Sequence, residues 1–181
     1  MEDVMRILVA YGSERGGTEG IAQMVAEVLR LAGFAVDVRA ASEVDALEGY
    51  GAVVLGGALY MGRWHRDARR FVLRHEAALR ALPVWLFSSG PLDDSATRGE
   101  QLPAVPGVQK LLARIGARGH VTFGGRLLPD AKGPIAHAMA RQHAGDWRNP
   151  AFIQRWAASI AVSLPRAAPQ GWLGASELRT P

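Results

Sequence analysis

A short segment near the N-terminus has the residue types and spacing of an anion-binding loop. The segment consists of Ser13, Glu14, Arg15, Gly16, Gly17 and Thr18. It follows the apolar run Ile7–Ala10 and precedes a stretch with helical periodicity. Gly16 and Gly17 allow close backbone approach, and Ser13 and Thr18 add hydroxyl donors. Because a helix that begins here presents free N–H groups and the positive end of its dipole, the segment predicts a phosphate site.

Two common nucleotide-binding loops do not match this segment. A P-loop requires a Lys after its second glycine, whereas Gly12 and Gly17 have that spacing but are followed by Thr18 and Glu19. The dinucleotide pattern Gly-x-Gly-x-x-Gly is also absent from this run. A single phosphate monoester, held by backbone and hydroxyl groups, fits best. A plain strand–helix turn without a ligand is the alternative.

The elements that would position this loop alternate between strand and helix. Apolar or alternating runs predict the strands Val4–Ala10, Phe34–Arg39, Ala52–Leu55, Val84–Phe87 and His120–Phe123. Helical patterns predict a helix from a Thr18 cap to Ala32, then Arg66–Ala81, Val108–Ile115, and a last helix opened by Asn149 and Pro150. Ser42–Leu47 predicts a short helix or turn, and a further short helix is expected around Ile135–Gln142. This alternation indicates an α/β protein with a five-stranded parallel sheet covered by helices on both faces.

Parallel sheets of this kind bind ligands at the carboxyl ends of their strands. The loops that follow the first, third and fourth predicted strands are therefore the candidate site. They are Gly12–Thr18, Ala58–Trp64 and Ser88–Leu92.

Length and composition limit the organisation and the class of protein. The 181 residues suit one domain, which we expect over 1–164, with a Pro-bearing flexible tail over 165–181. The sequence contains no Cys, which excludes thiolate chemistry and disulfides, and no His cluster has metal-ligand spacing. The N-terminus does not resemble a signal peptide, so we expect a cytoplasmic location.

The excess of positive charge lies partly in one region. The sequence has 21 Lys and Arg against 17 Asp and Glu, and seven Arg lie between Arg63 and Arg98. A solvated surface is the simpler interpretation; the alternative is a docking face for an acidic partner or for an anionic membrane, such as the inner face of the cell membrane. No helix-turn-helix, zinc-finger or RNP pattern indicates nucleic-acid binding.

Three segments together resemble the flavodoxin superfamily, in particular the flavodoxin-domain branch that includes menaquinone-dependent protoporphyrinogen dehydrogenase. They are the run Ile7–Ala22 around the anion loop, the run Val53–His65, and the run Val84–Leu92. The likeness continues weakly to Val162. The resemblance implies a three-layer flavodoxin-like fold with strand order 2-1-3-4-5, and FMN as the cofactor.

The resemblance also implies where FMN would bind. Its phosphate is expected in the loop Ser13–Thr18, and its ring between the two later loops. The expected cofactor-binding residues of those loops are Ala58, Leu59, Tyr60, Met61, Gly62, Trp64, Ser88, Ser89, Gly90 and Pro91. Tyr60 and Trp64 are the candidate stacking rings, with ordinary packing as the alternative for each. Ser88, Ser89 and Gly90 are expected to face the pyrimidine edge, and the Met61–Gly62 backbone to lie near flavin N5.

Some residues depart from the family pattern or leave its chemistry open. Arg15 stands where the usual phosphate loop has its middle Thr, and the stretch Leu128–Arg148 is shorter than the matching insertion of the quinone-linked dehydrogenase. Porphyrinogen is therefore only one candidate substrate. His65 is expected to be exposed, with a proton donor near the ring as the alternative. No side chain is needed as a catalytic acid or base, since the flavin carries the chemistry.

Three functions are consistent with the sequence. The leading hypothesis is an FMN-dependent oxidoreductase acting on a quinone, with or without a porphyrinogen as electron donor. The second is an electron-transfer or interaction module without its own substrate, docked through its basic surface. The third is a regulatory domain that has kept the fold and lost the flavin. The oligomeric state is left open.

Overall fold

A parallel sheet forms the centre of the molecule. The computed structural model describes residues 4–14, 16–92, 102–129, 140 and 144–165. Its parallel strands are β1 (Arg6–Gly12), β2 (Ala35–Ala40), β3 (Ala52–Tyr60), β5 (Val84–Ser89) and β6 (Gly119–Phe123). They lie in the order β2-β1-β3-β5-β6, and the short strand β4 (Arg63–Trp64) pairs antiparallel with the end of β3. With β4 set aside, this is the expected 2-1-3-4-5 order, which is confirmed.

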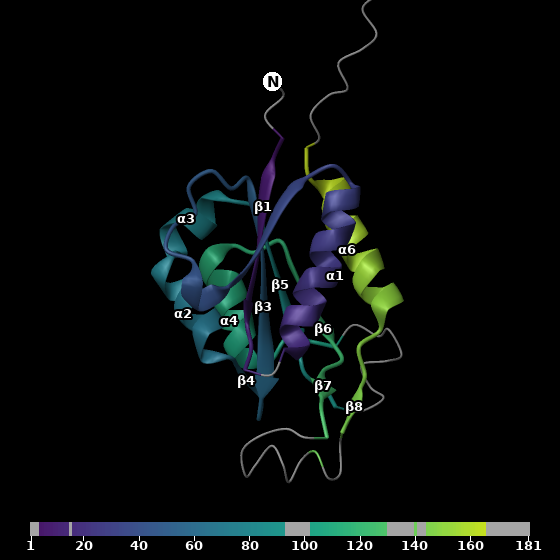
Figure 1. Cartoon of the computed structure of the whole chain (residues 1–181). Coiled ribbons are helices and arrows are strands. Elements are labelled where there is room, and N and C mark those ends of the chain that lie inside the picture. The colour runs from purple at the N-terminus through teal and green to yellow at the C-terminus, as the bar shows by residue number, and fades with distance from the viewer. Residues whose placement is uncertain (1–3, 15, 93–101, 130–139, 141–143, 166–181) are drawn as a thin grey trace, which may run out of the picture.

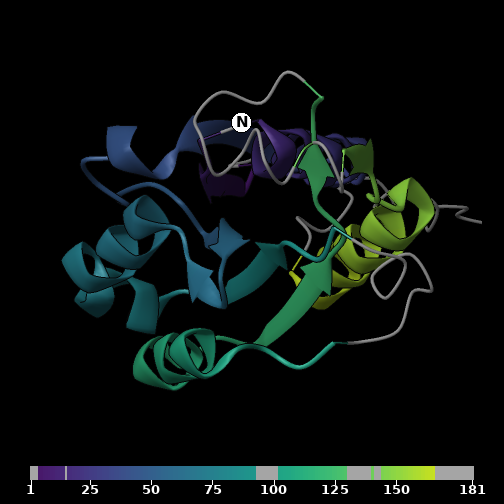
Figure 2. The ribbon, with the colours of Figure 1, turned by 90° about the horizontal axis from the view of Figure 1, so that it is seen from below.

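Helices cover both faces of the sheet, as Figures 1 and 2 show. One face carries α1 (Gly17–Leu31) and α6 (Pro150–Ser163). The other carries α2 (Arg66–Arg74), α3 (Glu76–Ala81) and α4 (Pro106–Ile115), with the 3₁₀ turn η1 (Ala41–Glu43) near the start of this layer. The three-layer architecture expected from the sequence is therefore confirmed.

Alternation along the central strands divides the core into two clusters. In β1, Ile7 and Val9 pack toward α1 and α6, whereas Leu8 and Ala10 pack toward α2, α3 and α4. All four side chains are fully buried. A strand buried on both faces must be apolar at consecutive positions, which explains why these runs were recognisable in the sequence.

Helix ends follow the expected chemistry in two places and depart from it in a third. Gly116 ends α4 with a left-handed φ of 64°, and the Asn149 side chain accepts a hydrogen bond from the Phe152 N–H at 3.0 Å. The single helix predicted over Arg66–Ala81 is wrong, because it is interrupted at His75. The His75 ring lies 4.8 Å from the Phe71 ring and its Nε2 pairs with the Val44 carbonyl at 3.2 Å, which fixes the break.

Strand β3 passes through two glycines that the sequence suggested would end it. A Cβ at Gly56 would lie 2.0 Å from the Phe87 ring, and one at Gly57 would lie 2.4 Å from the Trp64 indole. These glycines therefore serve close aromatic packing within the sheet, and the turn comes later. The predicted loop Ala58–Trp64 is accordingly a β-hairpin rather than an irregular loop.

Beyond β6 the chain forms a second, small sheet. Strand β7 (Arg126–Leu127) pairs antiparallel with β8 (Gly145–Asp146) below α1 and α6 in Figure 1. Most of the helix expected around Ile135–Gln142, the tail from residue 166 and Arg15 lie outside the described residues. Within the described ranges, no helix is both long and apolar enough to cross a membrane.

Candidate functional site

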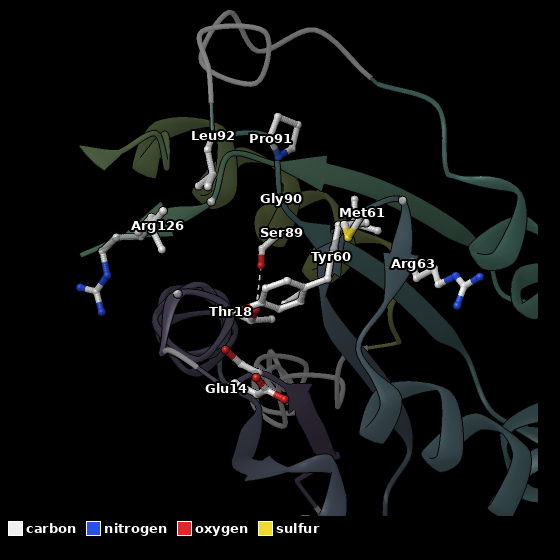
Figure 3. A pocket seen from close by; sticks show the side chains of 17 residues that line it. Glu14, Thr18, Tyr60, Met61, Arg63, Ser89, Gly90, Pro91, Leu92 and Arg126 are labelled. Atoms are coloured by element: carbon white, nitrogen blue, oxygen red, sulfur yellow. Dashed lines mark hydrogen bonds between the residues drawn. The ribbon is translucent and has the colours of Figure 1, made fainter. Parts of the chain in front are cut away.

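A cavity of about 970 Å³ opens at the carboxyl ends of the parallel strands. Four segments line it: part of the loop after β1 with the start of α1, the β3–β4 hairpin, the end of β5, and residues 125–127. Figure 3 shows their side chains around one space. The volume is near the upper end of the range for small-molecule sites, so it suits a ligand with several rings.

Gly16, rather than Thr18, is the N-cap of α1. Gly16 adopts a left-handed φ of 72°, and no side chain caps the helix. The first N–H groups of α1 have no intrahelical partner, and Gly16, which has no side chain, gives them no side-chain cap. Gly12 brings this loop close to α2, since a Cβ there would lie 2.8 Å from the backbone nitrogen of Ala68. The predicted anion site thus includes a helix N-terminus, but the N-cap of that helix is Gly16 and not the predicted Thr18.

Thr18 and Ser89 join two lining segments through a buried hydroxyl pair. Their oxygens are 2.7 Å apart, and the residues are 1% and 5% exposed. Only one hydroxyl can donate within the pair, so the accepting hydroxyl keeps its own proton for another partner. The two hydroxyls together therefore offer a ligand at most one donor.

The β3–β4 hairpin forms the opposite wall. Tyr60 pairs with Arg63 across a two-residue turn in which Met61 and Gly62 both have positive φ, 47° and 73°. Two positive φ values are typical of the type I′ turns that suit hairpins. Figure 3 shows the Tyr60 ring pointing from the hairpin across the pocket toward Thr18. Tyr60 therefore lies where a ring could stack on a flat ligand.

Three described residues of the predicted set, Gly16, Trp64 and Ser88, do not line the cavity. Trp64 is 4% exposed and belongs to the core cluster on the α2 side, and its buried Nε1 has no hydrogen-bond partner among the described residues. Ser88 is fully buried, and its hydroxyl pairs with His120 Nε2 at 2.8 Å. Gly90 does line the cavity, but its N–H donates to the Phe123 carbonyl at 3.0 Å. These placements correct the expectation that Ser88 and Gly90 offer donors to a ligand.

Sequence reasoning missed the fourth lining segment, Gly125, Arg126 and Leu127. The Gly125 N–H donates to the Pro91 carbonyl at 3.0 Å, which holds this segment against the end of β5. The pair Gly124-Gly125 directly after the last strand was a usable signal. It marks another loop at the carboxyl edge, and a Cβ at Gly124 would collide with the Trp147 backbone.

His65 is buried, so its expected exposure was wrong. It is 8% exposed, and its Nδ1 accepts a hydrogen bond from the Asp67 N–H at 3.3 Å as the cap of α2. Its Nε2 lies 3.6 Å from Glu14 Oε1. His65 thus connects the start of α2 with the loop after β1, behind the hairpin.

Comparison with known proteins decides the family. The chain matches the flavodoxin domain family over residues 8–131. It belongs to the flavodoxin domain family. Over 86 residues it is 28% identical to protoporphyrinogen IX dehydrogenase [quinone] from Escherichia coli K12, a match covering 46% of this chain and 48% of that protein. The chain therefore spans about half the length of the curated relatives it matches.

Solved structures show the same fold. Oxidised flavodoxin 2 from Bacillus cereus has a TM-score of 0.61 at 21% identity, covering 88% of this chain and 99% of that one. Rubredoxin oxygen:oxidoreductase from Desulfovibrio gigas has a TM-score of 0.52 at 14% identity, covering 90% and 39%.

The cofactor of this flavodoxin-domain protein is FMN. The residues present fit that group: the start of α1 lines one part of the cavity, and the Tyr60 ring points into it from the hairpin. The buried Nε of Arg126, at the phosphate end, has no hydrogen-bond partner in the part of the chain that the structure describes. The Arg126 guanidinium lies beside the N-terminus of α1, and both features favour an anion such as a phosphate.

Proposed function

We propose that the protein is an FMN-dependent oxidoreductase whose pocket admits a second, largely apolar reactant beside the flavin. The supporting observation is the cavity lining, to which Leu59 and Met61 of the β3–β4 hairpin and Leu92 after β5 contribute apolar side chains. A cavity of about 970 Å³ suits a multi-ring flavin and leaves an apolar rim at its mouth.

The substrate we propose is a quinone, with a porphyrinogen as a candidate electron donor. The name of the Escherichia coli relative, protoporphyrinogen IX dehydrogenase [quinone], supports this pairing. Each quinone takes up two electrons and two protons to become a quinol, and each porphyrinogen oxidation step releases the same number. When bound, FMN supplies the transfer of these electrons.

The chain's own residues would bind and orient both reactants. The start of α1 would hold the flavin phosphate, and Tyr60 would keep the ring in place by stacking, worth about 0.5–1.5 kcal/mol beyond buried area. Leu59 and Leu92 would exclude water from the reacting side. No described acid or base has to act on the substrate, because the protons of a quinol can come from solvent at the open mouth.

The experiment that tests this proposal begins with the visible spectrum of the purified protein and the mass of any released flavin. FMN with absorbance near ~450 nm is expected. Anaerobic mixing of the photoreduced protein with menadione, a soluble quinone, should then restore the oxidised spectrum rapidly. A colourless protein that takes up no FMN would overturn the proposal.

A second candidate, an electron-transfer module without its own substrate, is favoured by the outer face of α2. Arg66, Arg69, Arg70 and Arg74 are exposed there, and Arg63 precedes them at the pocket. Asp67 is the one acidic residue of α2. This charge would suit an acidic protein partner, or the anionic inner face of a membrane as a peripheral contact.

Substituting Arg66 and Arg70 by Gln distinguishes these possibilities. An electron-transfer module should lose reduction by an acidic ferredoxin at low salt but keep its reaction with menadione. A membrane contact should instead appear as sedimentation with phosphatidylglycerol vesicles and not with phosphatidylcholine vesicles. The double variant Arg39→Gln/Arg155→Gln removes equal charge elsewhere and should change neither result.

A further inference from the structure

Arg126 lies against the start of α1 with both its backbone and its side chain. Its carbonyl oxygen and nitrogen are 3.4 and 3.5 Å from the position that a Cβ would take at Gly17. Its Nη2 is 3.6 Å from the corresponding position at Gly16. The pairing of Arg126 with Asp146 between β7 and β8 fixes this placement. A cation is therefore held at the N-terminal end of a helix.

The charge of Arg126 is incompletely matched by nearby carboxylates. Asp146 is committed to Arg148, whose Nε donates to Asp146 Oδ1 at 2.8 Å and whose Nη2 donates to Oδ2. These bonds from Arg148 are the largest cause of the lowered pKa of Asp146, to which the charge of Arg126 adds only a small part. Asp146 is thus paired with Arg148, and within the described residues the buried Nε of Arg126 has no hydrogen-bond partner.

The other acidic residues near this end of α1 face different partners. The Glu14 carboxylate lies 3.6 Å from His65, and Figure 3 shows Glu14 and Arg126 on opposite sides of the helix start. Glu19, in the first turn, faces Tyr11, whose pKa is raised first by burial and then by the Glu19 carboxylate. Among the described residues, Glu14 and Glu19 are thus engaged elsewhere, and the guanidinium lies with the positive helix end in an arrangement that an anion would stabilise.

We propose that Arg126 is the residue that makes this pocket select a phosphorylated flavin over an unphosphorylated one. The inference rests on the proposed function, because it takes FMN as the ligand. The loop lacks the middle Thr of the usual phosphate loop, where Arg15 stands. The Thr18–Ser89 pair supplies at most one donor to a ligand rather than two. The Arg126 guanidinium compensates by neutralising the phosphate from beside Gly16.

The experiment compares FMN with riboflavin, which differ only in the phosphate. Apo-protein is titrated with each flavin, and quenching of flavin fluorescence gives the two dissociation constants. Arg126→Met should weaken FMN binding by about 10-fold to 100-fold, as expected for loss of a charge-assisted contact to phosphate. Riboflavin binding should change by less than about threefold, and Arg126→Lys should restore part of the FMN affinity.

The matched control is Arg63→Met, which removes the same charge from the hairpin side of the same cavity. It should leave the ratio of FMN to riboflavin affinity unchanged. Inorganic phosphate should compete with FMN for the wild type and less for Arg126→Met. Circular dichroism of each variant reports whether the fold is intact.

Two results would overturn the inference while leaving the proposed function standing. If Arg126→Met weakens FMN and riboflavin equally, Arg126 only braces the loop; if it weakens neither, the guanidinium does not reach the phosphate. A wild type that binds neither flavin would instead overturn the proposed function, and the inference with it.

Discussion

The two ends of the proposed flavin pocket, a proposed phosphate end and a hairpin end, are built in contrasting ways. At the phosphate end, Thr18 and Ser89 are buried and bonded to each other, and Gly12 packs directly on α2. At the hairpin end, Met61 is 96% exposed and a Cβ at Gly62 would meet nothing within 4 Å. One end is therefore part of the core, and the other is free to change conformation. Mutations at the phosphate end should change FMN affinity and protein stability. Mutations at the hairpin end should change the redox behaviour of the bound flavin.

The largest effect is expected at Gly12. Substitution by Ala places a Cβ 2.8 Å from the Ala68 backbone nitrogen, where no flexible side chain can move away. We expect the free energy of unfolding to fall by about 2–3 kcal/mol, as for other overpacked sites. Urea denaturation of the apo-protein measures this change in the free energy of unfolding.

Gly107→Ala is the matched control for Gly12→Ala, because a Cβ there meets nothing within 4 Å. Ala in that helix should leave stability unchanged or raise it slightly. If Gly12→Ala lowers the free energy of unfolding no more than Gly107→Ala does, the phosphate end is not packed against the core as described.

A smaller loss is expected for Thr18→Val. The change leaves the Ser89 hydroxyl buried without its partner, which costs about 1–2 kcal/mol of stability. FMN affinity should fall as well, whereas the reduction potentials of bound FMN should stay close to those of the wild type. The double variant with Ser89→Ala should cost less than the sum of the two single variants. Additive effects would mean that the two hydroxyls do not act as a pair.

The same contrast shows which features a sequence reveals. The strands around Ile7–Ala10 and Val84–Phe87 were predictable because burial on both faces forces continuous apolar runs. The strand, the glycines and the helix start of the predicted phosphate loop were recognisable because they are contiguous in sequence, whereas phosphate binding there stays a prediction. Contacts between distant segments were not: Trp64 and Tyr60 look equivalent as aromatic residues of one loop, yet only Tyr60 lines the pocket.

The structural role of the glycines was the hardest feature to predict from the sequence. Gly56 and Gly57 suggested a strand end, but they make room for Phe87 and Trp64, which come from other parts of the chain. Arg126 was missed for a related reason. Its relation to Gly16 depends on a tertiary contact between residues more than 100 positions apart, and no local pattern encodes it.

At the hairpin end, Gly62→Ala should act mainly on redox behaviour. Gly62 has a φ of +73°, so Ala there costs about 1 kcal/mol of stability through backbone strain. We expect the reduction potentials of bound FMN to shift, because the turn lies where the backbone is proposed to approach flavin N5. FMN affinity should change by less than about threefold, since Tyr60 and the phosphate end are intact.

Gly33→Ala provides the comparison for Gly62→Ala. Gly33 also has a positive φ, +96°, with nothing within 4 Å of a Cβ, but it ends α1 away from the pocket. Its variant should lose similar stability without moving the potentials. Equal potentials in all three proteins would show that the turn does not tune the flavin.

The smallest effect concerns the reverse side of the phosphate end, where Ser88 on β5 bonds His120 on β6. Burial lowers the pKa of His120 from 6.5 to about 4. Between pH 4 and pH 6.5 the unfolded chain binds a proton at His120 that the folded chain does not. The stability that comes from burying neutral His120 is therefore fully present above pH 6.5 and is lost as the pH falls toward 4. Allowing for partial solvent access, about 0.5–1 kcal/mol should be lost between pH 7 and pH 5. Urea denaturation at both pH values should show this loss in the wild type and not in His120→Gln. If His120→Gln loses the same stability between the two pH values, other groups cause the pH dependence. The Ser88–His120 pair would then be open to water.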